Sequence, residues 1–93
     1  MTELFAKLTA ATAAYNAFGN EVDLEQLASC LEALRVMEAA EREYNSAVAD
    51  KSAEWDALPR DDTRSSAEEN ADDTDTHGDR LYWLEVAVRS YYL

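Results

Sequence analysis

The sequence is poor in the residues that interrupt helices. It contains one proline and two glycines among 93 residues, while alanine is abundant. A β-sandwich or β-barrel needs many turns, and turns draw on proline and glycine, so these architectures are excluded. Alanine is the strongest helix former. We therefore expect an all-α fold, a small helical bundle, as a single domain over residues 1–93.

Cysteine and long apolar runs are also scarce. The one cysteine, Cys30, cannot form a disulfide within the chain, and we expect it to be a small apolar residue in a helix. No apolar stretch approaches the ~18 residues of a membrane span. The opening MTELFAKLTAATAAY lacks the basic and apolar segments of a secretory signal. These absences favour a cytoplasmic protein.

Basic residues are few: there are 8 Lys and Arg against 20 Asp and Glu, for a net charge of −12. Binding to DNA or RNA depends on Lys and Arg that neutralise phosphates, so direct nucleic-acid binding is not expected. Anionic membranes are disfavoured for the same reason. The charge favours a basic partner, such as a nucleic-acid-binding protein, a cationic toxin or a metal ion. A second explanation stays open, in which the charge only keeps the protein soluble.

Two helices are predicted in the first part of the chain. The first runs from Glu3 to Phe18, ends at Gly19, and carries an apolar seam at spacings of 4, 3, 4 and 3, which is Leu4, Leu8, Ala11, Tyr15 and Phe18. The second starts near Asp23, which forms a capping box with Gln26, and meets no breaker before Pro59. One long helix is favoured over two helices that meet at Asn45–Ser46.

The second helix also carries apolar residues at helical spacing. Its first series is Leu24, Leu27, Leu31 and Leu34, and its second is Met37, Ala40, Tyr44, Val48 and Trp55. Stripes of this kind are core positions far more often than ligand sites, so both are expected to be buried.

Residues 59–79 contain no large apolar side chain and many acids. They form either an acidic linker or an exposed helix capped by Ser66 with Glu69. The last helix is expected over Asp79–Tyr92, with Asp79 as its cap, and it is apolar nearly all round. Its own chain is not expected to cover such a helix, so we predict a homodimer or a partner contact at Trp83.

Neither a metal site nor a catalytic centre is expected. The segment ADDTDTHGDR matches the start of an EF-hand loop, but Leu84 occupies the twelfth position, where calcium needs a glutamate. His77 is the only histidine, and it lies beside Gly78 in the most polar part of the chain. No catalytic triad, phosphate loop or HExxH motif is present. We predict a non-enzyme without a cofactor.

An anionic stripe is the strongest candidate for a functional surface. If the helix capped by Ser66 continues into the last helix, Glu68, Asp72, Asp75 and Asp79 share one face. Carboxylates on one face repel one another, and we expect a protein to tolerate this cost when the charge provides solubility or binds a cationic partner. The predicted partner-binding residues are Glu68, Glu69, Asp72, Asp73, Asp75, Asp79 and Trp83. A merely solvated run of charge remains the alternative.

The segments ADDTDTHGD and SSAEEN, together with the charge balance, give the chain a profile that resembles the small acidic inhibitors of bacteriophages and mobile elements. Anti-CRISPR and anti-restriction proteins that mimic DNA are the main examples. The resemblance implies a non-catalytic inhibitor, acting in the cytoplasm of a bacterial host, that covers the DNA-binding surface of a target such as a CRISPR effector. Two alternatives remain: an immunity-type neutraliser of a basic toxin, and a helical scaffold or oligomerisation protein.

Overall fold

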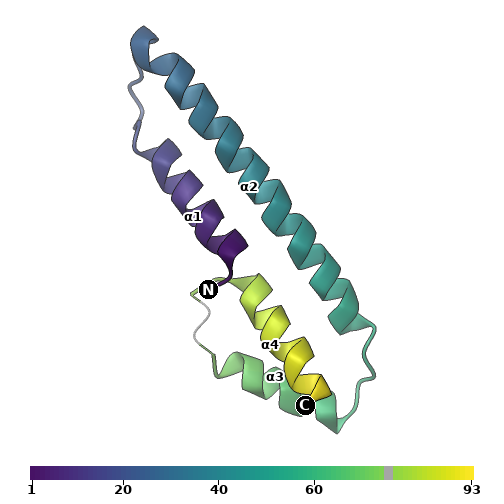
Figure 1. Ribbon diagram of the computed structural model, residues 1–93. Coiled ribbons are helices and arrows are strands. Elements are labelled where there is room, and N and C mark those ends of the chain that lie inside the picture. The colour runs from purple at the N-terminus through teal and green to yellow at the C-terminus, as the bar shows by residue number, and fades with distance from the viewer. Residues whose placement is uncertain (75–76) are drawn as a thin grey trace. The chain divides into compact units, whose positions relative to one another are not determined.

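The computed structural model describes residues 1–74 and 77–93, and these residues form four helices and no strand (Figure 1). The helices are α1 (Glu3–Asn16), α2 (Leu24–Asp56), α3 (Asp62–Asp72) and α4 (Arg80–Tyr92). The predicted all-α helical bundle is confirmed. Of the two alternatives for residues 59–79, an exposed helix is the one that forms, as α3.

The long helix α2 is continuous over 33 residues, as favoured from the sequence. It begins after Asp23, whose Oδ1 accepts a hydrogen bond from the backbone N–H of Gln26 at 2.9 Å. Asn45 and Ser46 are regular helical residues, so the predicted alternative of two helices is wrong. The helix ends shortly before Pro59, because a residue that precedes proline is disfavoured in helical geometry.

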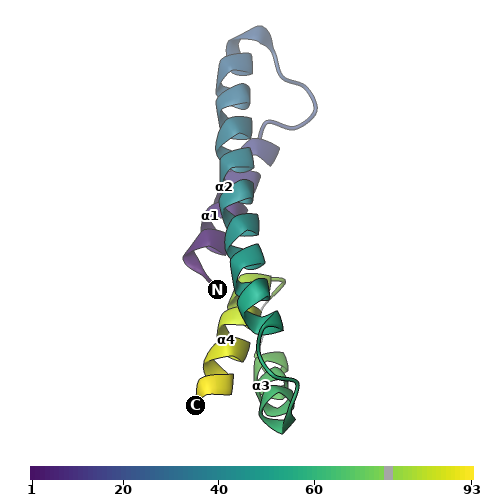
Figure 2. The same ribbon diagram turned by 90° about the vertical axis from the view of Figure 1, so that its right-hand side faces the viewer.

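The chain divides into two compact units, of which one comprises Glu3–Tyr44. In this unit α1 runs antiparallel to the first part of α2 (Figures 1 and 2). The rings of Phe5 and Tyr44 lie 5.6 Å apart between centroids, and Lys7 Nζ lies 2.9 Å from Glu43 Oε2. Ala11, Ala40 and Tyr44 are buried here, which confirms the seam of the first helix and the second series of α2.

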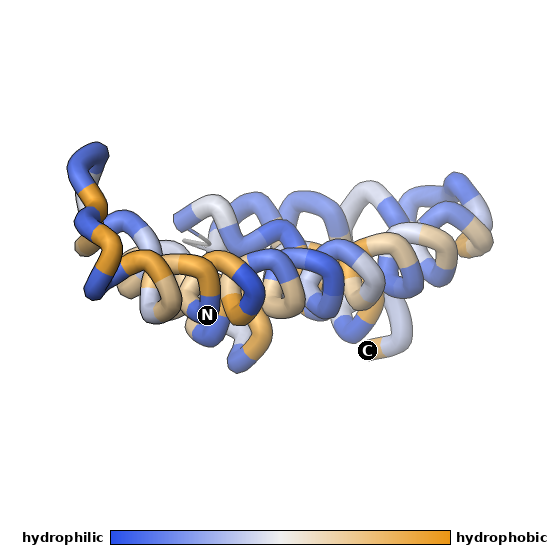
Figure 3. Tube along the Cα trace, turned by 90° about the horizontal axis from the view of Figure 1, so that it is seen from above, coloured by the Kyte–Doolittle hydropathy of each residue, from blue (hydrophilic) through white to orange (hydrophobic). Residues whose placement is uncertain are grey.

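The first leucine series of α2 behaves differently. Leu24 is 89% exposed, Leu27 is 45% exposed and Leu31 is 46% exposed, so their prediction as core residues is wrong. The physical reason is length, because α1 has only 14 residues and does not cover the whole helix beside it. Figure 3 shows hydrophilic and hydrophobic residues interleaved along the trace. Among the described helices, none combines the length and apolar character needed to cross a bilayer.

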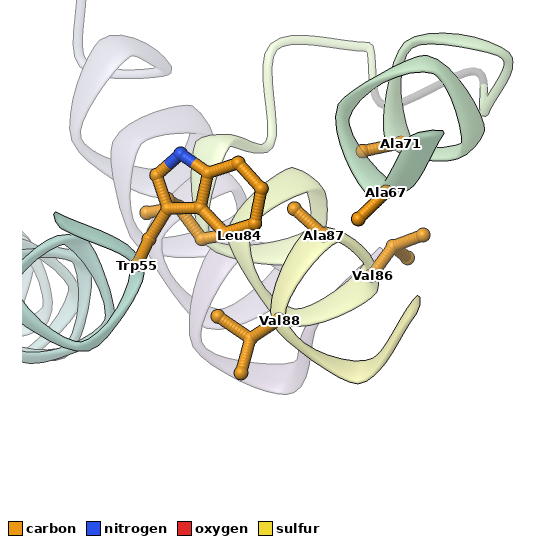
Figure 4. Packing of buried hydrophobic residues seen from close by; sticks show 7 residues of the cluster. All are labelled: Trp55, Ala67, Ala71, Leu84, Val86, Ala87 and Val88. Atoms are coloured by element: carbon orange, nitrogen blue, oxygen red, sulfur yellow. The ribbon is translucent and has the colours of Figure 1, made fainter. Parts of the chain in front are cut away.

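The other unit comprises Met1–Thr2 and Asn45–Leu93, and α3 packs directly on α4 within it (Figures 1 and 2). Ala67 and Ala71 of α3 face Val86 and Ala87 of α4, and Trp55 of α2 lies over Leu84 (Figure 4). Alanine side chains end at Cβ, so they let the two helices approach closely.

This packing corrects one expectation about α4. Its residues Leu81, Leu84, Val86, Ala87 and Val88 are buried. All of these except Leu81 belong to one cluster with residues of the chain's own α3 and the end of α2. The burial of these residues therefore does not itself require a second copy, and a homodimer or partner contact at Trp83 stays a prediction. Tyr82, Trp83 and Tyr91 remain only partly buried.

Candidate partner-binding surface

Asp79 caps α4, as predicted, but it does not lie on the surface. Its Oδ1 accepts the backbone N–H of Tyr82 at 3.2 Å, and its Oδ2 accepts the backbone N–H of Thr2 at 2.6 Å. The Thr2 hydroxyl donates to Oδ1 at 3.3 Å. Asp79 is 0% exposed, and it is the one buried charged residue among those described. Its assignment to the partner-binding set is therefore wrong, because a partner cannot reach it.

The anionic stripe depended on one condition, that the helix containing Ser66 continues into the last helix, and the described residues do not meet it. Helix α3 ends at Asp72, and the backbone N–H of Asp73 donates to the Glu69 carbonyl at 3.0 Å as the C-cap. His77 and Gly78 then take left-handed backbone angles, with φ of 48° and 86°, which redirect the chain before α4. Glu68 and Asp72 of α3 therefore do not share one helix face with Asp79, which precedes α4. Asp75 lies outside the described residues.

The start of α3 was also predicted at the wrong residue. Asp61, not Ser66, is the N-cap, and its Oδ1 accepts the backbone N–H of Arg64 at 3.1 Å. Ser66 and Glu69 lie inside the helix. Burial raises the pKa of Tyr91 above its ordinary value, and the negative charge of Asp61 and a hydrogen bond to that carboxylate raise it further. The residue that caps the start of α3 is thus one for which no role was predicted from the sequence.

Four predicted residues do share an exposed surface. Glu68, Glu69, Asp72 and Asp73 are all exposed at the end of α3, and we call this set the α3 acidic face. Glu68 with Asp72 and Glu69 with Asp73 are i,i+4 pairs, so each pair lies together on the helix surface. The side that carries Ala67 and Ala71 packs into the core instead.

Trp83 of α4 lies next to the α3 acidic face and contacts it directly. Its Nε1 donates a hydrogen bond to Asp72 Oδ1 at 2.7 Å, so the structure brings together two residues that were predicted separately. The ring of Trp83 meets that of Trp55 edge to face, with centroids 6.0 Å apart and planes at 84°. Edge-to-face contact of this kind is a favoured aromatic geometry.

A hollow of about 560 Å³ opens beside the two indoles. Its lining includes Trp55, Trp83, Asp56, Glu68, Asp72 and Arg80. No local sequence pattern marks Trp55, Asp56 or Arg80 as site residues, because they come from the end of α2 and the start of α4 and only the fold brings them together.

Arg64 supports the wall of this hollow. Its guanidinium lies over the Trp55 ring at 4.5 Å from the centroid. Its Nη1 donates to the carbonyls of Trp55 and Leu58, both at 3.0 Å, and so satisfies acceptors at the C-terminal end of α2. Its Nη2 lies 3.9 Å from Asp56 Oδ1. The side chain of Arg64 is only 12% exposed, which marks it as a structural residue.

Among residues 1–74 and 77–93, no three His, Cys, Asp or Glu side chains gather in an arrangement that could hold a metal ion. Comparison with known proteins gives no match, either to a family model, to a curated protein or to a solved structure.

Proposed function

We propose that this chain is a non-catalytic protein inhibitor of the anti-CRISPR kind, which covers a basic nucleic-acid-binding surface of its target and blocks DNA binding. The observation that carries the proposal is the α3 acidic face. It places four exposed carboxylates on the last turn and the C-cap of a short helix whose other side is anchored in the core. The chain as a whole has a net charge of −12.

The physical basis of the proposal is charge replacement. A DNA-binding surface holds Lys and Arg side chains that neutralise phosphates. Two carboxylates at i,i+4 on α3 are about 6 Å apart along the helix axis, so this face offers closely spaced negative charges to such side chains. Because the helix is fixed by packing on α4, little conformational freedom is lost on binding. Complementary charge also accelerates the encounter, in a salt-dependent way.

The test is capture from a bacterial lysate. The chain is immobilised and exposed to nuclease-treated lysate, and bound protein is eluted with duplex DNA. We expect a nucleic-acid-binding protein that DNA and raised salt both release. A variant with Glu68→Gln, Glu69→Gln, Asp72→Asn and Asp73→Asn should lose most of this capture, since each substitution keeps the shape and removes the charge.

The matched control neutralises four exposed acids on α2, as Glu25→Gln, Glu32→Gln, Glu38→Gln and Glu41→Gln. Its change in net charge is the same, so it should retain capture if the α3 acidic face is the contact. Equal loss in both variants would show that only overall charge matters. Full capture by the α3 variant would contradict the proposal. A captured toxin that DNA does not displace would instead indicate an immunity-type neutraliser.

The exposed leucines of α2 favour a second candidate, a scaffold or oligomerisation protein. Leu24, Leu27 and Leu31 present apolar surface to solvent at helical spacing. Self-association through this surface is driven by apolar burial and tolerates high salt. Capture through the α3 acidic face weakens steeply as salt rises. Sedimentation of the purified chain at low and high salt therefore separates the two candidates.

A further inference from the structure

The hollow beside Trp55 and Trp83 combines aromatic and acidic groups in one site. Its lining contains three carboxylates, from Asp56, Glu68 and Asp72, and one guanidinium, from Arg80. Three negative charges and one positive charge leave the lining with two negative charges. Its volume of about 560 Å³ lies in the range of about 300–1,000 Å³ that small-ligand sites occupy.

Its carboxylates are available to a ligand in different degrees. Asp56 is 71% exposed at its side chain, and its contact with Arg64 is long at 3.9 Å, so this pairing is weak. Glu68 is exposed on α3. Asp72 accepts one hydrogen bond from Trp83 Nε1, and a carboxylate can accept several. A cation in the hollow can therefore gain charge-assisted hydrogen bonds without breaking the core.

The indoles favour a planar cation over a compact one. A guanidinium stacks on aromatic faces and binds carboxylates with two parallel hydrogen bonds, whereas an ammonium is a strongly hydrated point charge. The protein already uses this chemistry internally, because Arg64 lies over the ring of Trp55 at 4.5 Å. Trp83 is only partly buried and hence accessible from the hollow.

We propose that this hollow binds an arginine side chain of the basic partner. The inference rests on the proposed function, since that function supplies a partner with exposed arginines, and it identifies the residue that the partner inserts. Trp83 provides the aromatic contact, and Asp56 and Glu68 hold the guanidinium. The α3 acidic face then attracts the partner electrostatically. The hollow determines the partner's position on this surface by binding one of its arginine side chains.

The experiment titrates the full chain, labelled with ¹⁵N, with N-acetyl-arginine amide. We expect a saturable shift of the Trp83 indole N–H resonance, assigned with a Trp83→Phe variant, and an affinity on the order of millimolar. N-acetyl-citrulline amide has nearly the same shape without the charge, and it should cause no saturable shift. N-acetyl-lysine amide should bind at least about threefold more weakly than the arginine amide.

The chain offers a matched pair of variants. Glu68→Gln removes a carboxylate from the hollow, and Glu69→Gln makes the same charge change one residue further along α3, outside it. We expect affinity for the arginine amide to fall about fivefold or more in the first variant and less than about twofold in the second. Equal effects of the two variants, equal binding of citrulline, or a shift confined to other resonances would each overturn the proposal.

The outcome can be separated from that of the proposed function. If the arginine amide binds in the hollow but capture from lysate survives neutralisation of the α3 acidic face, the site stands and the inhibitor proposal fails. If capture depends on the α3 acidic face but the arginine amide does not shift Trp83, the hollow is not the arginine site and the inhibitor proposal stands.

Discussion

Asp79 links residues from the two ends of the sequence. It accepts hydrogen bonds from Thr2 and from the first turn of α4, and it is fully buried. A buried carboxylate without such donors would be costly. Its removal would take the acceptor away from partly buried N–H groups of Thr2 and Tyr82. The Asp79 side chain thus caps α4 and also holds Thr2 against the start of that helix.

We predict that Asp79→Ala lowers the free energy of unfolding by about 2–3 kcal/mol, since a helix cap is lost and the partly buried Thr2 N–H loses the carboxylate to which it donates. Asp79→Asn should cost less, because asparagine also caps helices well, although its amide nitrogen cannot accept from Thr2. Urea denaturation measures both values. Asp50→Ala, an exposed change within α2, is the control and should stay within about 0.5 kcal/mol. Equal stability of Asp79→Ala and the control would show that the buried bonds contribute nothing.

The sequence predicted only part of the role of Asp79. A cap is a local feature, because an aspartate three residues before a backbone donor at the start of an apolar run indicates it. Burial depends on Thr2, which is separated from Asp79 by 77 positions in sequence. No local pattern carries that information, so the same residue was wrongly assigned to an exposed surface.

At the level of elements, α3 shows where local signals mislead. Ser66 with Glu69 matched a capping box, but Asp61 is the N-cap, the helix starts at Asp62, and Ser66 is interior. The segment was recognised as acidic and exposed, yet its attachment could not be foreseen. It contains no large apolar residue, and it is held instead by Ala67 and Ala71, whose partners lie on α4.

The close packing of α3 on α4 leads to a prediction at this scale. Ala71 is 0% exposed, so Ala71→Leu would force several extra carbon atoms into a filled interface. We expect a loss of about 1–3 kcal/mol in stability, seen as a lower melting temperature by circular dichroism. Asn70→Leu, on the neighbouring exposed position, is the control and should change stability little. If both substitutions gave the same melting temperature, the α3–α4 interface would be looser than the structure shows.

At the level of the whole molecule, helical content and acidity followed from composition alone. Two glycines and one proline are too few for a turn-rich β fold, and twenty acids make the chain strongly negative. The distribution of the core did not follow. Both series of α2 have apolar residues at helical spacing, but Leu24 of the first series is exposed while Trp55 of the second is buried. Which part of a long stripe is covered depends on the lengths of the helices that pack against it.

The two units differ in how much apolar surface they bury. In the unit Glu3–Tyr44 the buried residues are Ala11, Ala40 and Tyr44, whereas the other unit has a cluster built on Trp55, Leu84 and α3. Both tryptophans of the chain, Trp55 and Trp83, belong to the second unit. Their fluorescence therefore reports on that unit, while circular dichroism at 222 nm follows helices in both.

We predict that urea unfolds the unit Glu3–Tyr44 first, since less apolar burial gives a lower opening free energy. The dichroism transition should begin at lower urea than the fluorescence transition. Ala11→Gly, which costs about 1 kcal/mol in a helix, should move the early dichroism change and leave the fluorescence midpoint in place. If the two probes coincide and Ala11→Gly shifts both equally, the chain unfolds as one cooperative body and the division into units has no energetic counterpart.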